Sequence, residues 1–246
     1  MSKSKKQLRK EATLLVNRIR RNLQHANECK QPLSSSLSAF TSIQVNLQRG
    51  EGGKDESASS ATSTAMKNDA RNLEIEFSKS PLPDNLLNSC LNLFQENMSE
   101  MYKKSSWGLN MKEKEDELTH ENARYLLVVD SENKDDKSRG LLLAFAHFRF
   151  EVDDDDQPTQ EVLYLYEIQI SQLGQRNGIG KRLMQIMEIM AMQMKMRRVM
   201  LTVFKNNTDA MSFYRALKYS IDPSSPSQFG EEADYEILSK CVYRGE

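Results

Sequence analysis

Two kinds of hydrophobic pattern run along the chain and predict its strands and helices. Short apolar runs, and apolar positions that alternate with polar ones, predict strands over residues 72–78, 123–130, 140–153, 162–170, 197–204 and 233–243. Apolar residues at helical spacing predict helices over residues 5–30, 83–105, 177–195 and 207–219.

The order of these elements predicts how the strands pair. The polar stretch 131–139 joins two apolar runs, so we expect an antiparallel hairpin there. From residue 162 onward a strand, a glycine-bearing loop, a helix and a strand follow one another, which predicts a crossover with parallel pairing. The sequence therefore favours the α/β class, with one mixed twisted sheet and an added N-terminal helix.

Composition divides the chain into three segments. Residues 1–35 are strongly basic and are expected to hold one helix. Residues 36–72 are rich in Gly, Ser, Thr and charge, and we predict a low-complexity linker or insertion because they can bury little apolar surface. The folded domain is predicted to span residues 73–246.

Charge and cysteine content indicate the cellular setting. The net charge of −1 favours neither nucleic acid nor membrane, but the basic segment is a candidate contact for RNA, a ribosome or an import receptor. A solvated charged helix is the alternative. Cys29, Cys90 and Cys241 lack the spacing of a zinc site or disulfide framework, which suits a reducing compartment. With no apolar run near ~18 residues and no apolar signal region, we expect a cytoplasmic or nuclear monomer without a membrane or metal partner.

One carboxylate interrupts the apolar strand predicted over 162–170. Glu167 lies in the middle of the run YLYEIQI. An ionised carboxylate buried in a strand costs several kcal/mol unless it is paired, hydrated or used in chemistry. The structural interpretation is an ion pair with a neighbour such as Arg149, and the functional one is a proton acceptor.

A glycine-bearing loop, QRNGIGK at 175–181, follows the same strand and begins a helix. Gly178 and Gly180 let the backbone approach a ligand, and the helix N-terminus offers unpaired N–H groups to phosphate. The spacing excludes the Walker A motif and the dinucleotide fingerprint G-x-G-x-x-G. The remaining pattern, [QR]-x-x-G-x-[GA], resembles the coenzyme A loop of the GCN5-related N-acetyltransferases.

Further stretches resemble one family within that superfamily, the NatD N-terminal acetyltransferases, which act on the N-termini of histone-4 and histone-2A. They lie in order and include MYKKSSWG, AFAHFRFE, VLYLYEIQI, VMLTVFKNN, IDPSSPS and DYEILS, between residues ~100 and 240. The resemblance implies that acetyl-CoA is the acetyl donor. It also implies cofactor contacts by Ile168, Gln169, Ile170, Arg176, Asn177, Gly178, Ile179, Gly180, Lys181, Asn207 and Tyr214.

The reaction implied by this resemblance needs a proton acceptor, because an α-amine with a pKa near ~8 is mostly protonated at neutral pH. We assign that role to Glu167, with Tyr164 and Tyr166 holding a water or the substrate backbone. Strict alternation puts Tyr166 and Glu167 on opposite faces of the strand. Both can serve one site only if the strand is bulged or splayed, as the resemblance implies. Tyr214 is a candidate proton donor to the leaving thiolate, with a core aromatic as the equal alternative.

The substrate end is expected to be acidic. Glu151 and Asp153 follow the apolar face of the strand 140–153 and are placed to meet a cation, such as the arginine of a Ser-Gly-Arg start. His147 on the same face is interpreted as a packed, hydrogen-bonded core histidine. The resemblance implies a substrate-binding set of Tyr102, Trp107, Glu151, Val152, Asp153, Tyr166, Thr202, Ser224 and Tyr235.

Two other functions stay open at this stage. One is an acetyltransferase that acts on lysine side chains or a small amine. The other is a non-catalytic module that holds coenzyme A and docks on the ribosome through its basic helix.

Overall fold

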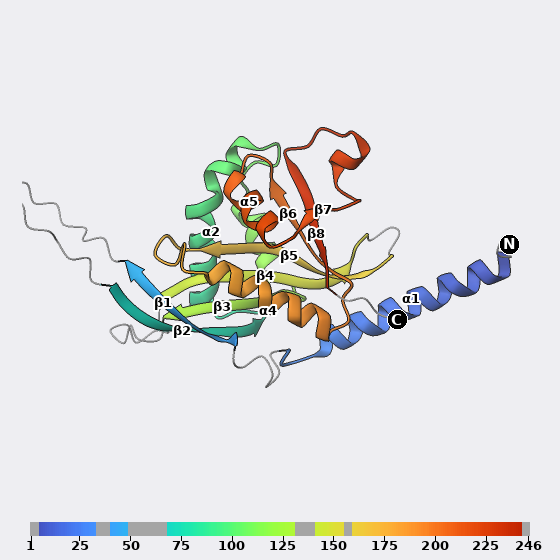
Figure 1. The fold of residues 1–246 in the computed structure, drawn as a ribbon, viewed down its shortest axis with the longest axis horizontal. Helices are drawn as coiled ribbons and strands as arrows, with labels where there is room; N and C mark the ends of the chain where they lie inside the picture. Colours follow the sequence, from blue (N-terminus) through green and yellow to red (C-terminus); the bar gives the residue numbers. More distant parts are fainter. Residues whose placement is uncertain (1–4, 33–39, 49–67, 131–140, 155–158, 243–246) are drawn as a thin grey trace, which may run out of the picture.

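The computed structural model describes residues 5–32, 40–48, 68–130, 141–154 and 159–242, and in this part eight strands form one sheet (Figure 1). The strands are β1 (Ser42–Gln48), β2 (Asn68–Lys79), β3 (Arg124–Asp130), β4 (Leu141–Val152), β5 (Glu161–Ile170), β6 (Arg198–Phe204), β7 (Ser220–Ile221) and β8 (Tyr235–Cys241). The helices are α1 (Lys5–Glu28), α2 (Asp84–Lys104), α3 (Met111–Thr119), α4 (Ile179–Gln193), α5 (Thr208–Ala216) and the 3₁₀ helix η2 (Pro226–Phe229).

The strand order is β1-β2-β3-β4-β5-β6-β8-β7, and it confirms the predicted mixed α/β sheet. Strands β5 and β6 pair in parallel through the crossover helix α4, while β3 and β4 form the predicted antiparallel hairpin. Every other pairing in the described sheet is antiparallel.

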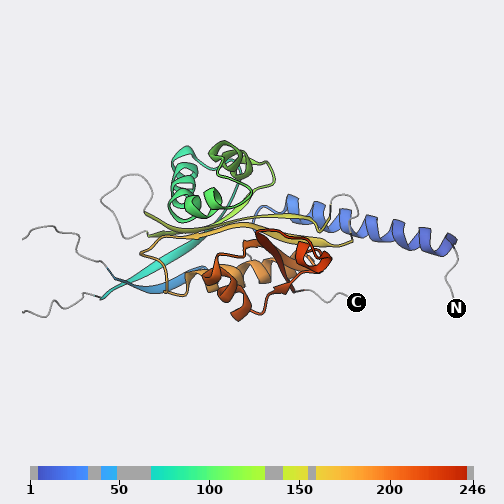
Figure 2. The ribbon, with the colours of Figure 1, turned by 90° about the horizontal axis from the view of Figure 1, so that it is seen from above.

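Helices cover both faces of the sheet. Figure 2 shows α2 and α3 on one face and α4 and α5 on the other. The larger core cluster lies under α4, where Leu183, Ile186, Met187 and Met190 are fully buried. The methionines of α4 therefore fill the core, as their helical spacing predicts.

Helix α1 docks on the sheet by its C-terminal half. Ile19 and Ala26 are buried, and Arg18 and Asn22 both bind the buried carboxylate of Glu161 at the start of β5, at 3.3 and 2.6 Å. The N-terminal half extends beyond the sheet (Figures 1 and 2). Among the described residues, no helix has both the length and the apolar character required to cross a membrane.

Strand β1 forms inside the interval 36–72, for which the sequence predicted a linker, and β2 begins in it, four residues before the strand predicted from residue 72. Strand β1 pairs along its whole length with the first half of β2. The side chains of Ile43 and Val45 alternate with exposed ones and are buried, so a regular strand pattern had been masked by the polar composition around it. Residues 36–39 and 49–67 of that prediction lie outside the described residues.

Strand β5 is distorted at Tyr166 and Glu167, where a bulge or splay was expected. His147 of β4 pairs with Glu167, whereas the next residue, Phe148, pairs with Leu165, so Tyr166 is the extra residue of a bulge. Pairing between β5 and β6 ends at Leu165 and Leu201, although both strands continue. The two strands therefore splay apart beyond this point and leave one side of residues 166–170 open.

Candidate active site

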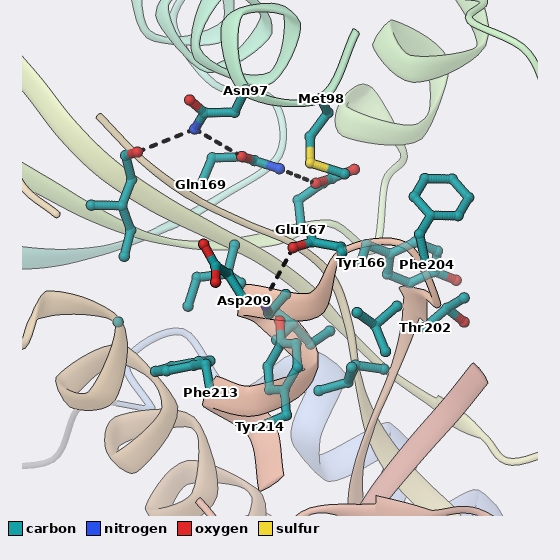
Figure 3. Close-up of a pocket in the computed structure, with 18 of the residues that line it drawn as sticks. Asn97, Met98, Tyr166, Glu167, Gln169, Thr202, Phe204, Asp209, Phe213 and Tyr214 are labelled. Carbon is teal, nitrogen blue, oxygen red and sulfur yellow. Dashed lines mark hydrogen bonds between the residues drawn. The ribbon is translucent and has the colours of Figure 1, made fainter. Parts of the chain in front are cut away.

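A cavity of about 880 Å³ lies at this splay, between the open half of β5, the end of β6 and helices α2 to α5 (Figure 3). Most of the residues predicted for the site line it. They are Tyr102, Trp107, Tyr164, Tyr166, Glu167, Ile168, Gln169, Ile170, Arg176, Gly178, Ile179, Gly180, Lys181, Thr202, Asn207 and Tyr214.

Six predicted residues do not line the cavity, and two of them lie next to residues that do. Glu151 accepts the hydroxyl hydrogen bond of Tyr166 at 2.9 Å, and the Tyr235 ring lies 5.1 Å from that of Trp107. These two residues therefore belong to the edge of the site.

The other four have local structural contacts instead. Asp153 accepts hydrogen bonds from the amides of Thr159 and Gln160, which joins the end of β4 to the residues just before β5. Ser224 donates to Asp222, and Asn177 donates to carbonyl groups of its own loop. Val152 ends β4 opposite the first residue of β5. The structure does not bring these four side chains to the cavity, because each is committed to a turn or strand end, and their ligand contacts stay predictions.

Glu167 lies in the cavity wall and is 6 % exposed. Its Oε1 accepts a hydrogen bond from Lys114 Nζ at 2.7 Å, and its Oε2 accepts one from Gln169 Nε2 at 2.7 Å. Burial raises the pKa of Glu167, and the positive charge of Lys114 opposes that rise. The partner expected from the sequence, Arg149, instead donates to the carbonyl oxygen of Glu117.

Lys114, on α3, is a site residue that was not predicted from the sequence. Its side chain is as buried as that of Glu167, although it lies in the highly charged segment MKEKEDELT. Burial lowers the pKa of this lysine, but the carboxylates of Glu167 and Glu117 outweigh burial and raise it. The sequence does contain one indication of this burial: Leu118 follows four residues later on the same helical face, and an apolar residue there indicates that the face points inward.

The bulge turns Tyr166 and Glu167 toward the same side of the sheet. The Tyr166 ring stacks on His147 at 5.1 Å, and His147 Nδ1 lies 3.7 Å from Glu117 of α3. Glu167 binds another residue of α3, so both side chains face this helix. His147 is fully buried as predicted, but neither ring nitrogen has a hydrogen-bond partner among the described residues, and burial lowers its pKa.

Three tyrosines of the cavity keep their protons at neutral pH. Burial raises the pKa values of Tyr164, Tyr166 and Tyr214. The negative charge of Glu167 adds to the effect at Tyr214, and both residues line the cavity. Tyr164 shares a 2.5 Å hydrogen bond with Thr202 of β6, just beyond the last paired residues.

The N-terminus of α4 forms the opposite end of the cavity and fits an anion. Gly178 caps the helix with φ +78°, a conformation that glycine adopts without strain. The first turn has no acidic residue and no side-chain cap, so its N–H groups can bind a ligand. Arg176 and Lys181 line the same part of the cavity and add positive charge.

An aromatic cluster borders the mouth of the cavity. Trp107 packs on Phe204 and Tyr235, each at 5.1 Å, and Phe204 packs on Tyr102 at 5.1 Å. The amide of Ser106 donates to Asp234, which ties the loop after α2 to the start of β8. Half of the Trp107 surface remains exposed, so this rim can contact a ligand as well as its neighbours.

Comparison with known families identifies the class of protein to which this fold and cavity belong. The model of the acetyltransferase (GNAT) family matches residues 87–219, more than half of the chain. The chain therefore belongs to this family of acetyltransferases.

Individual relatives are more distant. The chain is similar to N-alpha-acetyltransferase 40 of Saccharomyces cerevisiae, with 27 % identity over 161 residues. The match covers 58 % of this chain and 55 % of that protein, so the chain spans about half the length of this relative.

Solved structures share the fold. Arabidopsis thaliana NAA60 in complex with a bisubstrate analogue aligns with a TM-score of 0.52 at 12 % identity, over 70 % of this chain and 99 % of that chain. The NatC complex bound to Gag peptide and CoA aligns with a TM-score of 0.50 at 14 % identity, over 69 % and 99 % of the two chains. At these identities the likeness extends to the fold alone.

Proposed function

We propose that this chain transfers the acetyl group of acetyl-CoA to the α-amine of a protein N-terminus, and that tails beginning Ser-Gly-Arg-Gly, as in histone-4 and histone-2A, are its substrates. The observation that carries the proposal is the position of Glu167. This buried carboxylate lies in the wall of a cavity whose other end is a helix N-terminus suited to phosphate. The similarity to an N-alpha-acetyltransferase supports an α-amine as the acceptor.

The residues at the α4 end are suited to hold the donor. The N–H groups of Ile179, Gly180 and Lys181 begin the helix and can bind a pyrophosphate, with Arg176 balancing its charge. The open edge of residues 168–170 offers backbone groups to an extended arm in place of strand β6. When bound, acetyl-CoA supplies an acetyl thioester.

Glu167 is placed to accept the proton that the α-amine must lose. Its raised pKa brings it closer to that of an α-amine than an exposed glutamate would be, which improves general-base catalysis. Transfer through a water held by Tyr164 or Tyr166 is the interpretation that we favour, because both tyrosines line the same cavity as Glu167.

Tyr214 is placed to return a proton at the end of the reaction. It lies on α5, lines the cavity and keeps its O–H because burial and the Glu167 charge raise its pKa. A protonated phenol can donate to a departing thiolate.

The edge near Glu151 suits the cation of a Ser-Gly-Arg start. Glu151 binds the Tyr166 hydroxyl and lies 3.7 Å from Arg149, so its carboxylate is held at the side of the cavity. A substrate arginine would find a fixed acceptor there, next to the aromatic rim.

Coenzyme A release with synthetic peptides tests the proposal. The purified chain should acetylate Ser-Gly-Arg-Gly-Lys, and mass spectrometry should place the acetyl group on the α-nitrogen. The matched peptide with a blocked α-amine and free lysine should give no turnover. Turnover of the blocked peptide would instead indicate a lysine acetyltransferase, and binding of acetyl-CoA without any turnover would favour a non-catalytic module.

We also propose that the exposed half of α1 contacts a ribosome or RNA, in the cytoplasm or nucleus. Lys6, Arg9 and Lys10 are exposed and lie N-terminal to the docked half. Replacing all three by Ser should weaken co-sedimentation with ribosomes without changing the melting temperature. Unchanged co-sedimentation would remove this partner.

A further inference from the structure

Lys114 is an unusual residue on α3. Its neighbours Lys112, Glu113, Glu115 and Asp116 are exposed, whereas Lys114 itself is 6 % exposed. Lysine is almost never fully buried unless it is paired. The fold therefore places one charge of this helix inside the protein, at the cavity wall.

Two carboxylates accept hydrogen bonds from the Lys114 ammonium group. Its Nζ donates to Glu167 at 2.7 Å and to Glu117 at 2.8 Å. It also lies over two aromatic rings, 4.7 Å from the Phe94 centroid and 5.5 Å from that of Tyr102. Two carboxylates and the faces of two rings thus hold the ammonium group from several directions.

Glu167 is held on its other side as well. Its second oxygen binds Gln169, and Gln169 Oε1 accepts from Asn97 of α2 at 3.0 Å (Figure 3). A chain of hydrogen bonds therefore runs from α3 through the carboxylate to α2. This chain fixes the orientation of the carboxylate in the wall that faces the cavity.

We propose that Lys114 is a positioning residue for the acetyl transfer: it holds the Glu167 carboxylate in one orientation and keeps it ionised between reaction cycles. The inference rests on the proposed function, because Lys114 acts through Glu167. Stability alone does not account for the pair. Replacing a buried ion pair by apolar residues is often neutral or stabilising, and Phe94 and Tyr102 already provide apolar surroundings here.

The charges around Glu167 set the direction of the expected effect. From α3 it faces Lys114 and Glu117, from α2 Tyr102, from its own strand Gln169, and from α5 Tyr214. His147 of β4 lies behind Glu117. Lys114 supplies the positive charge among the groups that act on the pKa of Glu167, so its removal leaves burial and the Glu117 charge to raise that pKa further.

The test compares Lys114→Met with Lys112→Met, a matched change at an exposed position of the same helix. Lys114→Met should lower kcat by about 10- to 100-fold, less than the roughly 100- to 10,000-fold of a general base because Glu167 itself remains, and leave KM for acetyl-CoA within about 2-fold. The acidic limb of kcat against pH should move up by about one pH unit, as expected for the loss of a close opposite charge. Lys112→Met should change neither kcat nor the pH of its acidic limb, and Lys114→Arg should return the acidic limb to its wild-type pH.

A second variant removes a negative charge near Glu167 instead of the positive charge of Lys114. Glu117→Gln removes a like charge near Glu167 at a partly exposed position, so the acidic limb should move to lower pH. The pH midpoint of the Glu167 carboxyl carbon, followed by NMR and assigned with Glu167→Gln, should rise in Lys114→Met and fall in Glu117→Gln. This readout does not need turnover.

The outcomes separate the two claims. If the wild-type chain acetylates no peptide, the proposed function fails, and the NMR midpoints still test the effect of Lys114 on Glu167. If the wild type is active but Lys114→Met matches Lys112→Met in kcat and pH limb, the positioning role is wrong and the proposed function stands. NMR midpoints of Glu167 that do not move in either variant would also overturn the positioning role of Lys114.

Discussion

Strand β5 carries a buried carboxylate at each end of its regular part, and the two differ in what surrounds them. Glu161 is 1 % exposed and binds Arg18 and Asn22 of α1. It lies at the end of the strand that pairs with β4 on one side and with β6 on the other. Glu167 is 6 % exposed and binds Lys114 and Gln169, but one side of its backbone has no strand partner.

Burial and pairing therefore do not by themselves mark a functional carboxylate. Both residues satisfy the rule that a buried charge is paired. What distinguishes Glu167 is the splay beyond Leu165, which opens a cavity against the same strand. Glu161 joins two elements, whereas Glu167 lies where a ligand can enter.

The largest effect is expected at the open end of the strand. Glu167→Gln keeps the shape of the side chain but removes the proton acceptor, so kcat should fall by at least about 100-fold. Coenzyme A release and circular dichroism would measure activity and folding together. A folded variant with wild-type turnover would remove Glu167 from the mechanism and with it the contrast to Glu161.

A smaller loss is expected at the cap of α4. Gly178→Ala places a side chain at φ +78°, which costs about 1 kcal/mol and shifts the first turn, so KM for acetyl-CoA should rise by up to about 10-fold. Gly230→Ala is the matched control. That glycine has φ +74° and an equally open surrounding, but it ends η2 away from the cavity. An equal rise in KM in both variants would show that general strain, not the α4 turn, is responsible.

The carboxylate at the closed end should affect stability and not activity. Glu161→Gln weakens the attachment of α1, and we expect a loss of about 1 to 2 kcal/mol in the free energy of unfolding, because Arg18 is partly exposed and can regain water. Urea denaturation would measure this loss. Loss of turnover at a temperature where the variant is folded would contradict the division of roles between Glu161 and Glu167.

The smallest effect is expected for the outer partner of that pair. Arg18→Met leaves Asn22 bound to Glu161 and removes a charge that is 35 % exposed, so stability should change by no more than about 1 kcal/mol. A melting curve at low and high salt would show it, since a screened pair loses its contribution at high salt. A larger loss would mean that Glu161 depends on Arg18 as Glu167 depends on Lys114.

The sequence alone was sufficient to predict the helices and strands that have a local pattern of hydrophobic, polar or glycine positions. The alternation in 162–170, the polar turn before β4 and the glycine loop before α4 each placed an element, and together they gave the parallel crossover. The bulge at Tyr166 followed from the resemblance and not from the residues, because period-two alternation carries no sign of an extra residue.

Other features depended on contacts that no local pattern contains. Lys114 lies in a segment that resembles a solvated helix, and its burial arises only when α3 packs against Phe94 and Glu167. Asp153 was assigned to the substrate from its place along β4. Its carboxylate instead binds the amides of Thr159 and Gln160 just before β5, a side-chain-to-backbone contact that strand alternation does not predict.

The aromatic rim has a practical consequence. The chain contains one tryptophan, and it is Trp107 at the mouth of the cavity, half exposed and surrounded by three other rings. The tryptophan fluorescence of the protein therefore comes from one indole beside the entrance. A shift of its emission on adding a peptide reports occupancy directly, so dissociation constants can be obtained with unlabelled protein, including variants that do not turn over.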